Sequence, residues 1–180
     1  KSVRRYTTAL ELSKKHNIRF TEALATEGIA TVYSRQNNLD KAIEFGLKAF
    51  KINKAENQFR LIASSAHLLG VSYHLKDDLK NAAHYYGESL KGFEKIGDSL
   101  NVAVNYTHLG LIEKERDFDK GFQLQRKAHD FFERKEPMHY NAIQNAGNLS
   151  RSYLEIYQND SLTVNTGVKK MDALAKSDEL

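Results

Sequence analysis

Two histidines, His67 and His74, are the residues whose type and spacing come closest to a chemical site. A separation of seven residues places both imidazoles on one face of a helix, two turns and about 10 Å apart. Imidazole nitrogens are common zinc ligands, but a zinc site needs three or four ligands, and no third ligand has a suitable spacing. The pair therefore gives little support to a metal site, and the sequence predicts no metal and no cofactor.

No other motif for catalysis or phosphate binding accompanies the histidines. The chain lacks a glycine-rich phosphate loop, a nucleophile-elbow motif and a His-Glu-x-x-His motif. It also has no cysteine, which excludes disulfides and cysteine-ligated metal. We therefore expect no catalysis from this chain. Three triplets match the glycosylation pattern, and we interpret them as chance matches because the first two lie within expected helices: Asn105-Tyr-Thr107, Asn148-Leu-Ser150 and Asn159-Asp-Ser161.

The elements that carry these residues repeat with a period of about 40 residues. A period of this length is typical of helical repeat arrays. Because two helices cross closely only where one of them contributes a small side chain, each unit is expected to hold two antiparallel helices with a small residue at each crossing. The small residues form two series, Ala9, Ala49, Ser89 and Ala128, and, half a period away, Ala30, Gly70, Gly110 and Ser150.

With these recurring positions the chain resembles the tetratricopeptide repeat (TPR) family, in a variant of about 40 residues per unit. The resemblance implies an all-α fold, a right-handed superhelical solenoid of antiparallel helix pairs with about four repeats and a leading half repeat. The third repeat departs from the pattern, with Glu113 for a tyrosine, Gly121 for an alanine and one residue fewer in its turn. The best match is the second repeat, with Leu69-Gly70-x-x-Tyr73, Leu79, Ala82, Tyr86 and Ser89.

The expected organisation is a single array over residues 1–180. The half repeat matches only the second helix of a unit, which indicates a fragment of a longer protein. Gly97 is expected to end a helix. Pro137 is expected to lie in the first turn of the helix that opens the fourth repeat. The segment 161–176 is expected to form a final helix that closes the stack, or a degenerate repeat. The expected boundaries are 1–18 for the half repeat, about 19–58, 59–98 and 99–136 for the repeats, and 137–176 for a degenerate repeat or cap.

Charge and hydropathy add weaker constraints. The net charge is +4, and residues 1–60 hold 12 Lys/Arg against 6 Asp/Glu. A basic first third can steer an acidic partner, although charges at helical spacing are more typical of a solvated helix face. No apolar run approaches 18 residues, so no membrane span is expected. The sequence favours a soluble domain, cytoplasmic or periplasmic, and leaves the compartment open.

The TPR resemblance implies that ligands bind on a concave wall lined by the first helix of each repeat. This wall is mixed polar, suited to an extended peptide or a partner helix, with three further residues as side contacts. The expected wall residues are Glu27, Thr31, Arg35, His67, Val71, His74, Thr107, Leu111, Lys114, Gln144, Gly147, Arg151 and Glu155, and the side contacts are Asn105, His108 and Asn148.

One TPR subfamily is disfavoured by these residues. Arrays that clamp the acidic C-termini of chaperones use lysine, asparagine and arginine along the wall, where this chain has Glu27, Thr31, His67 and Val71. The run Phe93-Glu-Lys-Ile-Gly-Asp98 instead resembles two bacterial signalling groups. One is the TPR region of sensor histidine kinases and related transcription regulators, and the other is the peptide-pheromone receptors that include response-regulator phosphatases.

These resemblances predict a non-catalytic module that binds a protein or peptide as the sensing or docking region of a larger bacterial signalling protein. The alternatives are a peptide-pheromone-type receptor domain and a general scaffold for multiprotein assembly. A scaffold should lose affinity gradually with single substitutions, whereas a peptide receptor should depend on a few residues such as Arg151 and His67. No nucleic-acid partner is expected, and the ends of the array can support a homo-oligomer.

Overall fold

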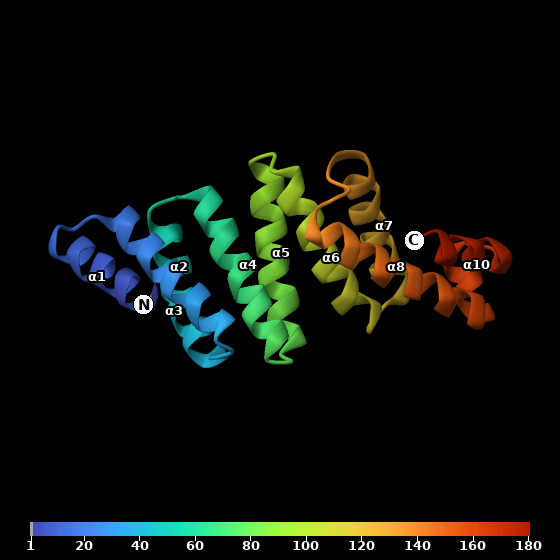
Figure 1. Ribbon diagram of the computed structural model, residues 1–180, viewed down its shortest axis with the longest axis horizontal. Coiled ribbons are helices and arrows are strands. Elements are labelled where there is room, and N and C mark those ends of the chain that lie inside the picture. Colours follow the sequence, from blue (N-terminus) through green and yellow to red (C-terminus); the bar gives the residue numbers. More distant parts are fainter. Residues whose placement is uncertain (1) are drawn as a thin grey trace. The chain divides into compact units, whose positions relative to one another are not determined.

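The computed structural model describes residues 2–180, apart from the side chains of residues 163–165. Every regular element in this part of the chain is helical, and the helices pack in consecutive pairs, which confirms the all-α prediction. The chain forms two compact units, Lys1–Asp98 and Ser99–Leu180. Within unit 1, successive helices run side by side and are joined by short turns (Figure 1).

Helix starts recur every 20 residues through most of the chain. Unit 1 contains α1 (Ser2–Lys15), α2 (Arg19–Arg35), α3 (Leu39–Ala55), α4 (Phe59–Leu75) and α5 (Leu79–Lys95). Unit 2 contains α6 (Ser99–Lys114), α7 (Phe118–Lys135), α8 (Tyr140–Gln158), α9 (Asp160–Thr166) and α10 (Lys170–Glu179). None of the helices in residues 2–180 has both the length and the apolar character needed to cross a membrane.

The helices of unit 1 all end in the same left-handed turn. After α2, the Asn38 amide donates to the Tyr33 carbonyl and the Asn37 amide to the Ser34 carbonyl, which is the Schellman pattern. Asn37 has a φ of 57°, and Gly97, the predicted helix-ending glycine, has a φ of 72° after α5. The same pair of hydrogen bonds recurs at Asn17, Asn57 and Asp77. This repeated turn sets the spacing of 20 residues between helix starts.

The turn between α6 and α7 breaks this pattern. None of the described residues of this turn has a left-handed backbone conformation. Helix α6 also has only 16 residues, whereas α2 and α4 each have 17. The shortened connection brings the start of α7 close to the end of α6, because a Cβ atom built on Gly121 would lie 2.5 Å from the Lys114 Cα atom. Glycine therefore occupies this position, where the sequence pattern led us to expect alanine, for a steric reason.

Small residues mark the helix crossings, as the period predicts. Ala30, Ala49, Ser89 and Ala128 are fully buried. At the crossing of α4 and α5, the Tyr86 ring lies so close to Gly70 that an added Cβ atom would lie 2.6 Å from Tyr86 Cδ1. The core of each unit is built from such interlocking contacts between successive helices.

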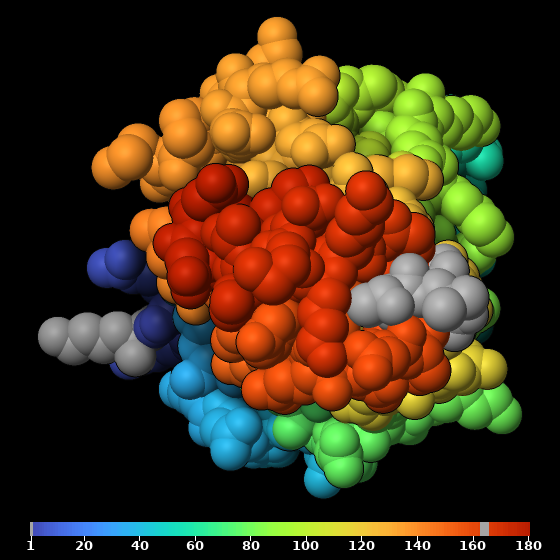
Figure 2. All heavy atoms as spheres, turned by 90° about the vertical axis from the view of Figure 1, so that its right-hand side faces the viewer, coloured from blue at the N-terminus to red at the C-terminus, as the bar shows by residue number. Residues whose placement is uncertain are grey.

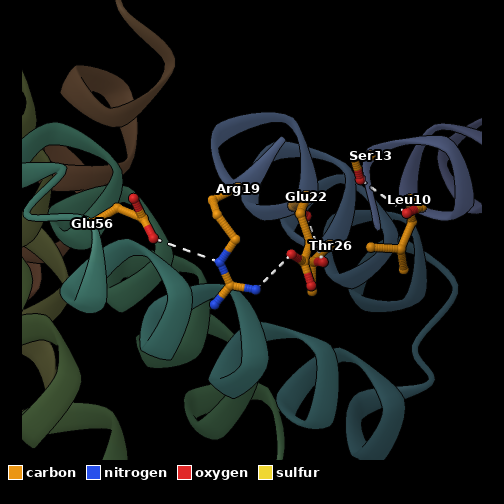
Figure 3. Close-up of polar contacts among 6 residues, drawn as sticks. All are labelled: Leu10, Ser13, Arg19, Glu22, Thr26 and Glu56. Carbon is orange, nitrogen blue, oxygen red and sulfur yellow. Dashed lines mark hydrogen bonds and ion pairs between the residues drawn. The ribbon is translucent and has the colours of Figure 1, made fainter. Parts of the chain in front are cut away.

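Polar contacts link residues about one period apart. Arg19 at the start of α2 donates through one guanidinium nitrogen to Glu22 at 2.8 Å, and its Nε lies 3.5 Å from Glu56 in the turn after α3 (Figure 3). One repeat later, Arg60 pairs in the same way with Asp98 at 2.5 Å. A shorter link joins neighbouring helices, since the buried Asn53 amide of α3 donates to the Leu61 carbonyl of α4 at 3.1 Å.

The last part of the chain differs from the sequence expectation in two places. Pro137 does not open a helix: it lies in a turn, and α8 begins at Tyr140, with His139 as the capping residue. The segment 161–176 is not one helix, because Gly167, at a φ of 68°, separates α9 from α10. The later start of α8 follows from the cap, since the His139 Nδ1 accepts a hydrogen bond from the Asn141 amide at 3.2 Å.

Candidate functional site

In unit 1, the predicted wall residues lie on α2 and α4 with differing exposure. Arg35 is exposed, whereas Glu27, Thr31, His67 and His74 are half-buried. Glu27 joins the two helices, because the Ser64 hydroxyl of α4 donates to its Oε1 atom at 2.6 Å. Thr31 turns its hydroxyl back to the Glu27 carbonyl at 2.9 Å. The hydrogen bond between Ser64 and Glu27 therefore ties the first helices of successive repeats together.

The Glu27 carboxyl is poorly solvated. Its second oxygen, Oε2, is buried and has no hydrogen-bond partner in the structure. Burial raises the pKa of Glu27, and the hydrogen bond from Ser64 opposes this only in part. The folded-state pKa of Glu27 therefore exceeds its unfolded-state pKa. The neutral carboxyl stabilises the fold fully at pH values below the unfolded-state pKa, and this contribution is lost as pH rises through the folded-state pKa.

We therefore expect Glu27→Gln to stabilise the protein at pH 7, since glutamine keeps an acceptor for Ser64 without the charge. The expected rise in Tm is about 2–4 °C, equivalent to about 1 kcal/mol. The difference should shrink in acid, where wild-type Glu27 is protonated. Thermal unfolding at both pH values is the measurement, with Glu44→Gln on the exposed face of α3 as the control. An equal difference at neutral and acid pH would show that the charge is not the cause.

His67 and His74 are separated by an aromatic ring. The centroid of the Tyr86 ring lies 5.6 Å from that of His67 and 6.3 Å from that of His74. Tyr86 is fully buried, and burial raises its pKa. Within residues 2–180, no group of three or more His, Asp or Glu side chains has a geometry that could hold a metal ion. The two imidazoles therefore pack against an aromatic core residue.

In unit 2, α6 carries fewer accessible residues than the sequence suggested. Asn105 and Thr107 are fully buried, and their side chains donate to carbonyls one turn earlier in α6. His108 and Leu111 are half-buried. Lys114 is largely buried and reaches α8, where it pairs with Glu155 at 2.8 Å and donates to Ser152 at 3.3 Å. Lys114 and Glu155 thus join two first helices, as Glu27 and Ser64 do in unit 1.

The most accessible of the expected surfaces lies on α8. One face of α8 is buried through Asn145, Leu149, Ser152, Tyr153 and Ile156. Gln144 and Asn148 lie at its margin, half-buried, and the Asn148 amide nitrogen is buried without a partner. The opposite face is open to solvent. We call it the α8 stripe, and it consists of Tyr140, Ile143, Gly147, Arg151 and Leu154.

The α8 stripe is largely apolar. Tyr140 is 74% exposed and Ile143 is 69% exposed, and Leu154, 37% exposed, lies on the same face of α8 beyond Gly147 and Arg151. A Cβ atom on Gly147 would meet nothing within 4 Å, so the middle of the stripe is flat and open. Arg151 is exposed and makes no ion pair with the part of the chain that the structure describes. The stripe therefore combines an apolar row with one available cation.

Sequence reasoning found Gly147 and Arg151 but missed Tyr140, Ile143 and Leu154. Large apolar residues at helical spacing are usually core residues, so the pattern gave no reason to single these three out as surface residues. Their exposure follows from the rotation of α8, which presents Leu149 and Tyr153 to α7 and α10.

Comparisons with known proteins support the fold. No protein-family model matches the chain. No curated protein matches it either. Among solved structures, the crystal structure of BtubC (BKLC) from P. vanneervenii is similar, with a TM-score of 0.72 and 19% sequence identity. The similarity covers 97% of this chain and 69% of the BtubC chain. At this level of identity it supports an all-helical, repeat-like architecture.

Proposed function

We propose that this chain is a TPR-type module that binds a protein segment and has no catalytic activity of its own. The observation that carries the proposal is the α8 stripe, an exposed apolar row on the first helix of a repeat. Contiguous exposed apolar residues on a folded domain typically mark interaction sites. Arg151 adds a planar cation that can pair with a carboxylate of the bound segment.

The shape of the stripe suits a helix or an extended peptide. Tyr140, Ile143 and Leu154 span about four helical turns, or about 21 Å, along α8. A partner with apolar side chains at matching intervals and an acidic residue opposite Arg151 would cover it. We infer that such a segment belongs to a signalling partner, in line with the resemblance of Phe93–Asp98 to bacterial sensor regions. A peptide-pheromone-type receptor and a general scaffold remain the alternatives.

Selection from a random peptide library tests the proposal. The immobilised chain should enrich sequences that combine spaced apolar residues with at least one acidic residue. Enrichment should disappear when the Ile143→Asp variant is used in place of the wild-type protein, because a charge within an apolar interface is costly. Enrichment of the same sequences by the Ile143→Asp variant, or no enrichment by the wild type, would contradict the proposal.

The alternatives differ in how affinity depends on single residues. If Arg151→Ala alone removes most binding to the selected peptides, a receptor that relies on a few residues is favoured. If alanine substitutions along the stripe each cause small losses, a scaffold with a broad interface is favoured.

A further inference from the structure

A second candidate site lies in unit 2, away from the α8 stripe. Both α7 and α10 pack against α8, and a hollow of about 290 Å³ remains between them. Its floor is the buried face of α8, at Leu149 and Tyr153. Figure 2 views unit 2 from the side of α10, whose atoms are drawn in red. We call this space the α7–α10 hollow, and its volume is near the lower end of the range for small-molecule sites.

The walls of the hollow carry charges of both signs. From α7 come Arg126, His129, Asp130 and Glu133, and from α10 come Lys176 and Glu179. Within the described residues, the only ion pair among these side chains is the long contact of 3.9 Å between His129 and Glu133. The remaining charges border the same cavity without pairing and are available to a ligand that carries both charges: Arg126, Asp130, Lys176 and Glu179.

Aromatic rings hold the two strong cations at the hollow. The Lys176 Nζ atom lies 5.8 Å from the centroid of the Tyr153 ring, and the Arg126 guanidinium lies 5.9 Å from that of Phe122. Contacts of this kind orient a cation but leave its hydrogen-bond donors free. Burial raises the pKa of Tyr153, so its hydroxyl remains neutral.

The charges are also ordered along α7. Arg126, Asp130 and Glu133 lie on successive turns, so the cation and the last carboxylate are separated by about 10 Å along the helix axis. An extended chain spans about 3.3–3.6 Å per residue, so two residues span about 7 Å. A ligand of that length reaches from the cation to the first of the carboxylates.

We propose that the α7–α10 hollow binds a zwitterion of dipeptide size, as a free ligand. Its carboxylate lies at Arg126 and Lys176, its ammonium group lies at Asp130, and its side chains lie over Leu149 and Tyr153. Both charged ends are required, because a ligand with one charge would leave opposite charges in the hollow unmatched. The site is independent of the α8 stripe, which lies on the opposite face of α8.

Calorimetric titration of the 180-residue chain with glycyl-leucine tests the proposal. Saturable binding with a Kd of about 1 mM or tighter is expected. N-acetyl-glycyl-leucine and glycyl-leucinamide, which each lack one charge, should bind at least about tenfold more weakly. Equal binding of the acetylated compound would overturn the proposal in favour of a plain anion site. The absence of saturable binding by glycyl-leucine would overturn it outright.

Variants locate the binding. Lys176→Gln on exposed α10 and Arg126→Gln on α7 should each weaken glycyl-leucine binding by about tenfold. Arg134→Gln is the matched control, because Arg134 is exposed on α7 and does not line the hollow. If Arg134→Gln weakens binding as much as Lys176→Gln does, the effect is one of net charge and the assigned site is wrong. Ile143→Asp should leave this affinity unchanged, which separates the hollow from the α8 stripe.

Discussion

Replacing Tyr86 by alanine is expected to lower the free energy of unfolding by about 3–5 kcal/mol, the cost typical of removing a large buried aromatic side chain. Tyr86 is 1% exposed and packs against Gly70 and against both His67 and His74. The loss removes contacts that join α4 to α5. Denaturant unfolding followed by circular dichroism measures the effect, and hydrogen exchange should accelerate first in these two helices.

A second substitution tests whether the contact between Tyr86 and Gly70 causes this effect. Gly70→Ala alone should destabilise the protein by about 1–3 kcal/mol, because the added methyl group would overlap the Tyr86 ring. In the Tyr86→Ala background the same change should cost little, since the overlapping ring is gone and alanine favours the helix. The two substitutions are therefore expected to couple. An equal cost of Gly70→Ala in both backgrounds would show that the crossing is not packed as described.

Gly121→Ala is expected to destabilise the protein by about 3 kcal/mol, at the upper end of the range for overpacking. At Gly70 the neighbour is a side chain, whereas at Gly121 the neighbour is the backbone of Lys114, which moves only if α6 and α7 separate. The helix preference for alanine, about 1 kcal/mol, offsets part of the strain and is included in this value. Denaturant unfolding is again the measurement.

Gly147→Ala is the matched control for this substitution. Gly147 also lies within a helix of unit 2, but an added Cβ atom meets nothing within 4 Å. This variant should be as stable as the wild type, or more stable by up to about 1 kcal/mol. If the stability of Gly121→Ala matched that of Gly147→Ala, α6 and α7 would not approach each other as closely at their shortened turn as the structure shows.

Helix pairing was predictable from sequence because it depends on local, repeated features. The small residues at Gly70 and Ala49 recur at a fixed period, and close crossings require them. The helix end at Gly97 followed from the preference of glycine for a positive φ. At Gly121 the sequence showed a departure from the repeat, but only the path of the turn between α6 and α7 explains it.

The candidate sites were less predictable because they depend on helix rotation and on the weakly periodic end of the chain. Tyr140 and Ile143 resemble core residues until the orientation of α8 is known. The start of α8 depends on the His139 cap, whereas the sequence analysis expected Pro137 to lie in the first turn of this helix. The α7–α10 hollow requires the position of α10, in a segment where the repeat pattern has faded. A cavity formed by three helices cannot be predicted from the periodicity of the sequence.

The most direct test of the central claim, that the α8 stripe binds a protein segment, is the affinity of a library-selected peptide for two variants. Ile143→Asp places a charge in the stripe, and Met171→Asp places the same charge on another exposed apolar residue, on α10. Fluorescence anisotropy should show at least about a tenfold loss for Ile143→Asp, a difference of about 1.4 kcal/mol, and no change for Met171→Asp. Equal affinities for the two variants would contradict the assignment of the α8 stripe as the binding surface.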